Sequence, residues 1–251
     1  MILNTCSFCD IGLEREVNQD NVFCGADGES ILAAVADGMG GHEHGERASG
    51  TICEMLRIWW RAYRETPVKP SFSESLQELE NVIQRSNARI RASMPDTAIC
   101  GSTLTLLWIA KERWALLSIG DSRCYLESET FWGKRLRQLS TDDVWENQEE
   151  VKKGYTRTEI MRHPNYGSLT KAVGAEDVFS CEKKEGRLKG TSVFLLCSDG
   201  VYRYCSGKML KQALGDILKG RNMKECLEKI RQEAYRNGAP DNLSAAAVYV
   251  H

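Results

Sequence analysis

The chain has 251 residues, of which 42% are hydrophobic and 27% charged, and its formal net charge at pH 7 is -2. These proportions are ordinary for a folded globular protein, and this length can bury a large core within one domain. The near-neutral charge argues against a nucleic-acid or membrane surface, so neither partner is expected. The sequence also contains no secretory-type leader and no apolar stretch of ~18 residues, so we expect a cytoplasmic protein.

Predicted strands and helices follow one another without a regular βαβ order. Short apolar runs bounded by turn residues predict strands at 30–37, 102–110, 113–121, 191–199 and 242–250. Apolar residues with a period of about 3.6 predict helices at about 45–63, at 73–90 and over 223–234, the last ending at Asn237-Gly238. The two central strands predict a hairpin. This order favours an α+β fold with antiparallel sheets.

The sequence shows no internal repeat, low-complexity tract or Pro/Gly-rich linker. We therefore expect a single domain over 1–251. The polar stretch 140–167 is long for a connection and carries no sustained apolar strand, which predicts a small helix or a functional flap, with a plain surface loop as the alternative. The ten cysteines are scattered and only Cys6 and Cys9 form a C-x-x-C pair, so reduced thiols are expected rather than a zinc site or disulfides.

Aspartates mark the ends of the predicted core strands. The residues concerned are Asp20, Asp37, Asp121, Asp199 and Asp241. One Asp-Gly pair after a strand is typical of a plain turn. Several carboxylates gathered at one edge of a sheet repel one another and require cations.

Carboxylates, backbone carbonyls and water are ligands for hard divalent ions, so the pattern favours Mg²⁺ or Mn²⁺ over zinc. Two such ions can acidify a bridging water for in-line attack on phosphorus. A phosphatase or a nuclease follows from this chemistry, and the absence of a basic face in the composition favours the phosphatase.

A set of short motifs along almost the whole chain adds specificity to this prediction. In order they are Arg15 with Asn18-Gln19-Asp20, Asp37-Gly38-Met39-Gly40-Gly41-His42, Gly101-Ser102-Thr103, Gly120-Asp121-Ser122-Arg123, 169–174, Ser198-Asp199-Gly200 and Asp241-Asn242. Together they resemble the metal-dependent Ser/Thr protein phosphatases of type 2C, particularly the bacterial members. The resemblance implies a four-layer fold, in which a central sandwich of two antiparallel sheets is flanked by helices on both sides.

The resemblance also implies roles for individual residues. Asp37 bridges two Mn²⁺ or Mg²⁺ ions and Gly38 contributes its carbonyl, Asp199 and Asp241 bind the second ion, and Asp20 orients or binds metal water. Asp121, with Asp199, matches a weaker third metal position. Arg15 matches the group that grips substrate phosphate, and Thr103 and Asn242 match supporting residues. The substrates implied are phosphoserine and phosphothreonine in proteins that a Ser/Thr kinase phosphorylates, and 140–167 matches the flap.

The sequence departs from many relatives at two positions beside the expected site. Gln19 stands where they carry Glu, and Met39 stands where many eukaryotic relatives carry a histidine general acid. Methionine cannot donate a proton, so the leaving oxygen must be protonated by water on the metals or, less favoured, by His42 or His44. The alternative function is a weak or inactive relative that binds phosphoproteins as a regulator, although all five acids are present.

Overall fold

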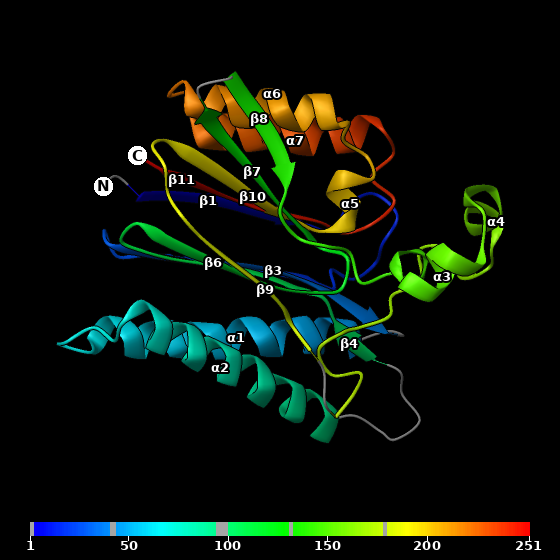
Figure 1. The fold of residues 1–251 in the computed structure, drawn as a ribbon, viewed down its shortest axis with the longest axis horizontal. Coiled ribbons are helices and arrows are strands. Elements are labelled where there is room, and N and C mark those ends of the chain that lie inside the picture. Colours follow the sequence, from blue (N-terminus) through cyan, green and yellow to red (C-terminus); the bar gives the residue numbers. More distant parts are fainter. Residues whose placement is uncertain (1–2, 41–43, 94–99, 131–132, 178–179) are drawn as a thin grey trace.

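The computed structural model describes residues 3–40, 44–93, 100–130, 133–177 and 180–251. Its centre is a sandwich of two antiparallel sheets (Figure 1). One sheet has the strand order β1-β11-β10-β7-β8 and the other the order β2-β3-β5-β6-β9, with the short strand β4 also paired to β3. The predicted α+β architecture with antiparallel sheets is confirmed.

The strands have the following bounds. The first sheet contains β1 (Leu3–Asp10), β7 (Arg123–Thr130), β8 (Gly133–Gln138), β10 (Ser192–Cys197) and β11 (Leu243–Val250). The second contains β2 (Asp20–Ala26), β3 (Ser30–Gly40), β4 (Cys100–Ser102), β5 (Leu104–Ala110), β6 (Arg113–Ile119) and β9 (Glu182–Arg187). The predicted hairpin is present as β5 paired with β6, from Ala110↔Arg113 to Leu104↔Ile119.

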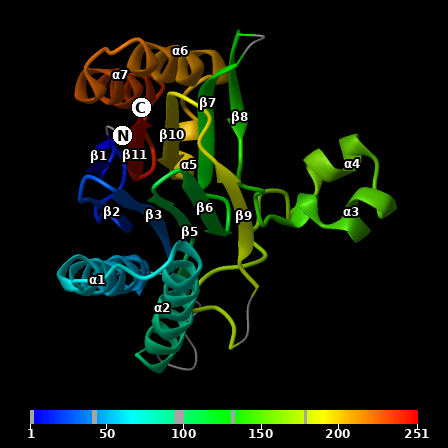
Figure 2. The same cartoon turned by 60° about the vertical axis from the view of Figure 1, so that its left-hand side comes forward.

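The longer helices form two outer layers, one on each sheet (Figures 1 and 2). The layer on the second sheet is α1 (His44–Glu65) with α2 (Phe72–Ala92), and the layer on the first is α6 (Gly207–Leu218) with α7 (Met223–Arg236). Helix α2 begins with a capping box between Ser71 and Glu74, and α7 ends as predicted, with Asn237 as its cap. None of the helices in the described part of the chain is long and apolar enough to span a bilayer.

Alternation along β3 explains why four layers form. Ile31, Ala33 and Val35 belong to the core between the sheets, whereas Leu32 and Ala34 belong to the core beneath α1 and α2. A third apolar cluster lies between the other sheet and the α6/α7 layer. Successive side chains of a strand point to opposite faces, so a strand that is apolar throughout needs a packed layer on each side.

The observed strands differ from the predicted ones at their ends. The segment predicted as one strand at 102–110 is divided at Thr103, whose N–H donates to the carbonyl of Asp37 over 2.8 Å. Strand β6 stops at Ile119 because Gly120 takes a positive φ of 91°. Strand β10 stops at Cys197, and Asp199 begins the short helix α5 (Asp199–Tyr202). These breaks all occur where the predicted site residues lie.

The segment 140–167 leaves the sandwich and folds into short helices rather than a strand. They are η1 (Trp145–Asn147), α3 (Glu149–Gly154) and α4 (Arg157–Arg162), and they project from one end of the sandwich (Figure 2). Trp145 stacks on His163 with ring centroids 4.0 Å apart, and Tyr155 packs edge-on against both rings. The predicted helical excursion is therefore present, with a small aromatic cluster of its own.

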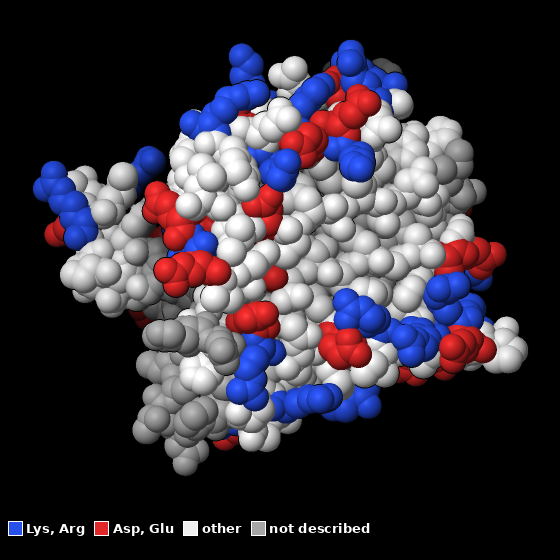
Figure 3. All heavy atoms as spheres, turned by 180° about the vertical axis from the view of Figure 1, so that it is seen from behind, with Lys and Arg blue, Asp and Glu red and all other residues white. Residues whose placement is uncertain are grey.

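On one face of the molecule the charged side chains lie mainly near two opposite edges (Figure 3). Seen from behind, Lys, Arg, Asp and Glu are intermixed along the α6/α7 layer and along the α1 side, with a largely uncharged band between them (Figure 3). All ten cysteines lie in the described residues, and none forms a disulfide.

Candidate metal centre

The predicted aspartates gather at the end of the sandwich nearest α3 and α4 (Figure 1). Asp20 opens β2 and is paired in register with Asp37 of β3, which places two acids on adjacent strands. Asp199 follows β10 and Asp241 precedes β11, a pair of neighbouring strands in the facing sheet. The strand ends therefore bring together residues that are more than 200 positions apart in the sequence.

A cavity of about 320 Å³ opens among these strand ends. It is lined by Arg15, Gln19, Asp37, Gly38, Met39, Gly40, Thr103, Asp121, Gly167, Leu169, Asp199, Arg203, Asp241 and Asn242. Every predicted site residue except Asp20 is in this lining. Gly167 and Leu169, at the end of the projecting segment, form part of its wall, so the predicted flap adjoins the site.

Thr103 fixes the backbone of Asp37. The Thr103 N–H donates to the Asp37 carbonyl over 2.8 Å, and the Asp37 N–H donates to Thr103 Oγ1 over 3.0 Å. Thr103 Oγ1 also lies 2.7 Å from Ser122 Oγ, which ties it to the turn after β6. The carboxylate of Asp37 is thus presented by a strand whose position is fixed on both sides.

Gly38 follows Asp37 in a space that admits no side chain. A Cβ at this position would collide with the backbone carbonyls of Gly45 and Gln19. Gly200, after Asp199, is similar, because a Cβ there would collide with the carbonyl of Asn242. These glycines allow the strand ends and helix starts to approach closely enough to surround one cavity.

Burial and mutual repulsion raise the pKa of the central carboxylates. Asp20 is almost fully buried, and burial followed by the charges of Asp199 and Asp241 raises its pKa to about 7. Burial raises the pKa of Asp37 well above its usual value, and the charge of Asp20 adds to this. Burial, then the charge of Asp199, raises the pKa of Asp121 to about 6.

The donor set fits a hard divalent cation. Ser198 Oγ donates to Asp20 Oδ2 over 2.8 Å, but Asp20 Oδ1 is buried without a hydrogen-bond partner among the described residues. An orphaned buried oxygen is costly, and repelling carboxylates around it are stabilised by a positive ion. Among the residues that the structure describes, however, no group of three Asp, Glu, His or Cys side chains is already gathered tightly enough to hold one. Two arginines hold several of these carboxylates.

Arg15 forms an ion pair with Asp241. Its Nε and Nη2 donate to Oδ1 and Oδ2 of the carboxylate, both over 2.9 Å, in a two-pronged ion pair. Asn242 holds the loop that carries Arg15, because its Nδ2 donates to the carbonyls of Ile11 and Val17 over 2.9 and 3.1 Å. The same amide accepts from the N–H of Gln19 over 2.9 Å. Asn242 therefore connects β11 to the loop before β2.

Arg203, which was not predicted from the sequence, contacts the two aspartates at the other end of the cavity, Asp121 and Asp199. Its Nη2 lies 3.3 Å from Asp121 Oδ2 and its Nε lies 3.2 Å from Asp199 Oδ2. The i,i+4 spacing of Asp199 and Arg203 at a helix start is a signal that could have indicated the second contact. The contact with Asp121 joins residues 82 positions apart and has no local signature.

The remaining predicted residues have different surroundings. Met39 lines the cavity, and Gln19 Nε2 donates to the carbonyl of Gly40 over 3.2 Å. His42 lies outside the described residues. His44 begins α1, does not line the cavity, and has a buried Nδ1 with no hydrogen-bond partner in the described part of the chain.

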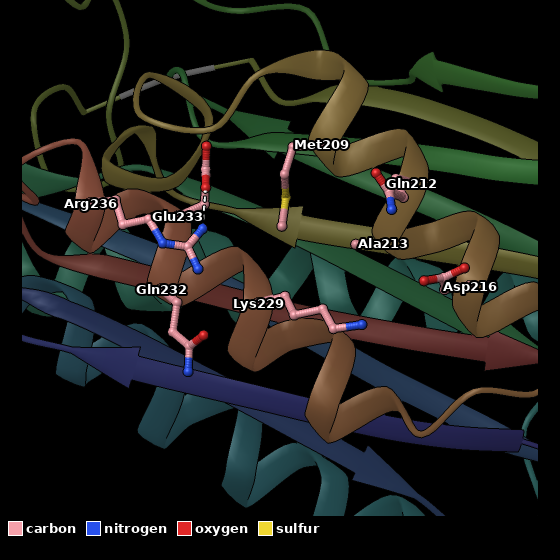
Figure 4. A pocket seen from close by; sticks show the side chains of 8 residues that line it. All are labelled: Met209, Gln212, Ala213, Asp216, Lys229, Gln232, Glu233 and Arg236. Atoms are coloured by element: carbon pink, nitrogen blue, oxygen red, sulfur yellow. Dashed lines mark hydrogen bonds and ion pairs between the residues drawn. The ribbon is translucent and has the colours of Figure 1, made fainter.

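A second cavity, of about 400 Å³, lies against α6 and α7 (Figure 4). Its acids are paired with basic neighbours: Glu233 with Arg236 over 2.7 Å, and Asp216 with Arg221 over 3.6 Å. It therefore lacks the crowded carboxylates of the first cavity, which remains the candidate metal centre.

A two-sheet sandwich between helical layers, with aspartates from both sheets around one cavity, is the arrangement expected from the sequence motifs. The family model for protein phosphatase 2C matches residues 14–244. The chain belongs to the protein phosphatase 2C family.

Named relatives include bacterial enzymes. The chain is 30% identical over its full length to the serine/threonine protein phosphatase PstP of Mycobacterium tuberculosis, of which it covers 45%. It therefore spans about half the length of that relative. It is also 30% identical to the serine/threonine phosphatase stp of Listeria welshimeri, with 95% of this chain and 92% of the relative covered.

Solved structures match the whole fold. The crystal structure of Mycobacterium tuberculosis PstP/Ppp matches with a TM-score of 0.79 at 29% identity, covering 100% of both chains. A structure of the catalytic domain of PstP in complex with 2 manganese ions matches with a TM-score of 0.75 at 27% identity, covering 99% of both chains. The expected sandwich flanked by helices is thereby confirmed.

Proposed function

We propose that this protein hydrolyses phosphoserine and phosphothreonine in proteins with the help of two divalent metal ions. The observation that carries the proposal is the carboxylate of Asp37, which lies in one cavity with Asp121, Asp199 and Asp241 and is paired in register with the buried Asp20. Membership of the protein phosphatase 2C family and relatives named as serine/threonine phosphatases support the choice of substrate class.

The chain's own residues divide the work of holding the ions. Asp37 would lie between them, with the Gly38 carbonyl on one ion and Asp199 and Asp241 on the other, while Asp20 would hold or orient water through its unpartnered Oδ1. When bound, the ions would acidify water and stabilise charge on the phosphoryl oxygens. Mn²⁺ and Mg²⁺ both suit oxygen ligands, and the manganese-bound PstP structure supports Mn²⁺ as the first ion to try.

Arg15 would bind the phosphate of the substrate. A guanidinium presents two parallel N–H donors that match two phosphoryl oxygens, as they match the two oxygens of Asp241 in this structure. The side chain of Arg15 is 53% exposed at the mouth of the site, so it can change partner. Thr103 would support Asp37, and Asn242 would support the loop of Arg15.

Residues 1–251 would form one catalytic unit, with the projecting segment 140–167 as its flap. Trp145, Tyr155 and His163 form an aromatic cluster on that segment, which would contact part of a phosphoprotein. Substrates of a Ser/Thr kinase are the expected targets.

The test is phosphate release from a phosphothreonine peptide by metal-stripped protein, with Mn²⁺, Mg²⁺ or neither. Release that needs the metal and is lost in Asp199→Ala is the expected result. Asp216→Ala, at the second cavity, is the matched control and should behave as wild type. No release under any condition from folded protein would contradict the proposal and would favour the alternative, a regulator that binds phosphoproteins without hydrolysing them.

A further inference from the structure

The guanidinium of Arg203 lies between two carboxylates that a further metal ion would need. Its Nη2 contacts Asp121 Oδ2 over 3.3 Å and its Nε contacts Asp199 Oδ2 over 3.2 Å. The two carboxylates are well shielded, with side chains 6% and 17% exposed. A buried carboxylate pair of this kind needs a positive partner, and here an arginine supplies it.

Neighbouring residues fix this arrangement. Tyr202 donates its hydroxyl to Asp121 Oδ2 over 3.2 Å, the same oxygen that Arg203 contacts. The Tyr202 ring is covered in turn by the guanidinium of Arg123, 3.6 Å from the ring centroid. Arg123 is anchored by Asp142, whose Oδ2 lies 2.7 Å from its Nη2. The orientation of Asp121 is thus set by a chain of contacts that reaches the base of the flap.

The donors at this position do not fit a third metal ion. A divalent ion would have to displace Arg203 from both acids at once and take an oxygen that already accepts from Tyr202. Displacing the Arg203 guanidinium would break two ion pairs, whereas displacing Arg15 would break an ion pair with one carboxylate only. Asp121 and Asp199 therefore form a site for the Arg203 guanidinium rather than for an exchangeable metal ion.

We propose that Arg203 takes the place of the third metal ion that the sequence motifs predict at Asp121 and Asp199. The protein would then bind two divalent ions and use the guanidinium as its third positive charge. This inference rests on the proposed function, because it presumes that the other carboxylates hold metal. Arg203 is a positioning residue here: it neutralises Asp121 and holds the orientation of Asp199, which is a ligand in the proposed site.

The experiment counts bound manganese without measuring activity. Metal-stripped protein is dialysed to equilibrium against Mn²⁺ up to millimolar concentrations, and the metal bound per chain is determined by elemental analysis. The variants are Arg203→Ala, Arg203→Lys and the double variant Arg203→Ala with Asp121→Asn. Arg221→Ala, which removes the partner of Asp216 at the second cavity, is the matched control. Arg203 is half-exposed, and thermal melts verify that each variant is folded.

Two ions per chain are expected for wild type, Arg203→Lys and Arg221→Ala. Three are expected for Arg203→Ala, since Asp121 and Asp199 then lack their cation, and two again for the double variant. Three ions in wild type, or two in Arg203→Ala, would overturn the inference while leaving the proposed function intact. Wild-type protein that binds no manganese would refute the proposed function, and this inference with it.

Discussion

An arginine lies at each end of the acidic cavity, and the two arginines contact their aspartates in different ways. At one end Arg15 contacts a single carboxylate, that of Asp241, and both side chains are well exposed, at 53% and 34%. At the other end Arg203 contacts Asp121 and Asp199, which are nearly covered, and Tyr202 shares its Asp121 oxygen. An ion pair exposed to water contributes little stability, whereas carboxylates shielded from water depend on their cation.

The difference separates two uses of the same side chain. In the proposed mechanism Arg15 would leave Asp241 when a metal ion binds there, and its two donors would then be available to the substrate phosphate. Arg203 has no comparable exchange open to it, because its departure would remove the cation from two shielded acids at once and leave Asp121 only the hydroxyl of Tyr202. In the proposed site, Arg15 therefore pairs with a residue that would bind metal, and Arg203 takes the place of a metal ion.

The largest effect on activity is expected at Asp37, which lines the same cavity as Arg15 and Arg203. Asp37→Asn removes the carboxylate between the proposed ions and should lower kcat by ~10³-fold or more, since several kcal/mol of transition-state stabilisation depend on them. Manganese binding should fall with it. Thermal melts should show a folded protein, because burial and four neighbouring acids oppose the charge of Asp37 in the metal-free state. Retention of wild-type kcat would exclude the proposed metal centre.

Arg15→Ala separates the two properties of the exposed end. Loss of a charged two-pronged contact with phosphate should lower kcat/KM for a phosphopeptide by about 10–100-fold, from ~1.5–3 kcal/mol of lost binding. Manganese affinity should rise, because Asp241 is released from its ion pair. Steady-state kinetics and calorimetric titration measure the two effects. A parallel fall of both would show that Arg15 supports the metal rather than competing with it.

Asn242→Ala is expected to weaken the same end without touching its charges. The variant loses the hydrogen bonds to Ile11, Val17 and Gln19 and should reduce the free energy of unfolding by about 2 kcal/mol. The loop of Arg15 loses its anchor, so KM should rise several-fold with a smaller change in kcat. Asn237→Ala, which removes a hydrogen bond at the end of α7, is a control for stability loss away from the site.

The smallest effect concerns the pH dependence of the metal-free protein. The pKa of Asp20 is raised to about 7 and that of Asp121 to about 6, so between pH 4 and 7 the folded state binds more protons than the unfolded state. The free energy of unfolding therefore falls as the pH rises through this window. Arg203→Ala should steepen the fall, because the charge of Arg203 favours the ionised forms of Asp121 and Asp199. Thermal melts at stepped pH, without metal, provide the measurement, and a rising stability would contradict the burial of these carboxylates.

Much of the fold could be predicted from the sequence because the central strands are apolar on both faces. Strands β3, β5, β6, β10 and β11 lie within predicted segments or extend them by a few residues. The edge strand β9 was missed because its sequence, EKKEGR, is almost entirely charged and forms a strand only through its pairing with β6. Helix α6 was also missed, although Leu210, Ala213, Leu214 and Ile217 repeat with a helical period.

The candidate site shows the same division between local and distant signals. Aspartates at strand ends and their glycines can be recognised in the sequence, and the structure places them around one cavity. The partners of those aspartates cannot be recognised in the sequence, because Arg15 and Asp241 are 226 positions apart and Arg203 and Asp121 are 82 positions apart. Such contacts depend on which distant strands become neighbours in the sheet, here β1 with β11 and β7 with β10, which no local pattern specifies.

A crystal structure of the protein grown with Mn²⁺ tests the difference between the two arginines most directly. We predict two manganese ions at Asp37, with Asp241 turned to metal, Arg15 released from it, and Arg203 still between Asp121 and Asp199. A manganese ion bound by Asp121 and Asp199 with Arg203 displaced, or Arg15 still paired with Asp241 beside two bound ions, would contradict it.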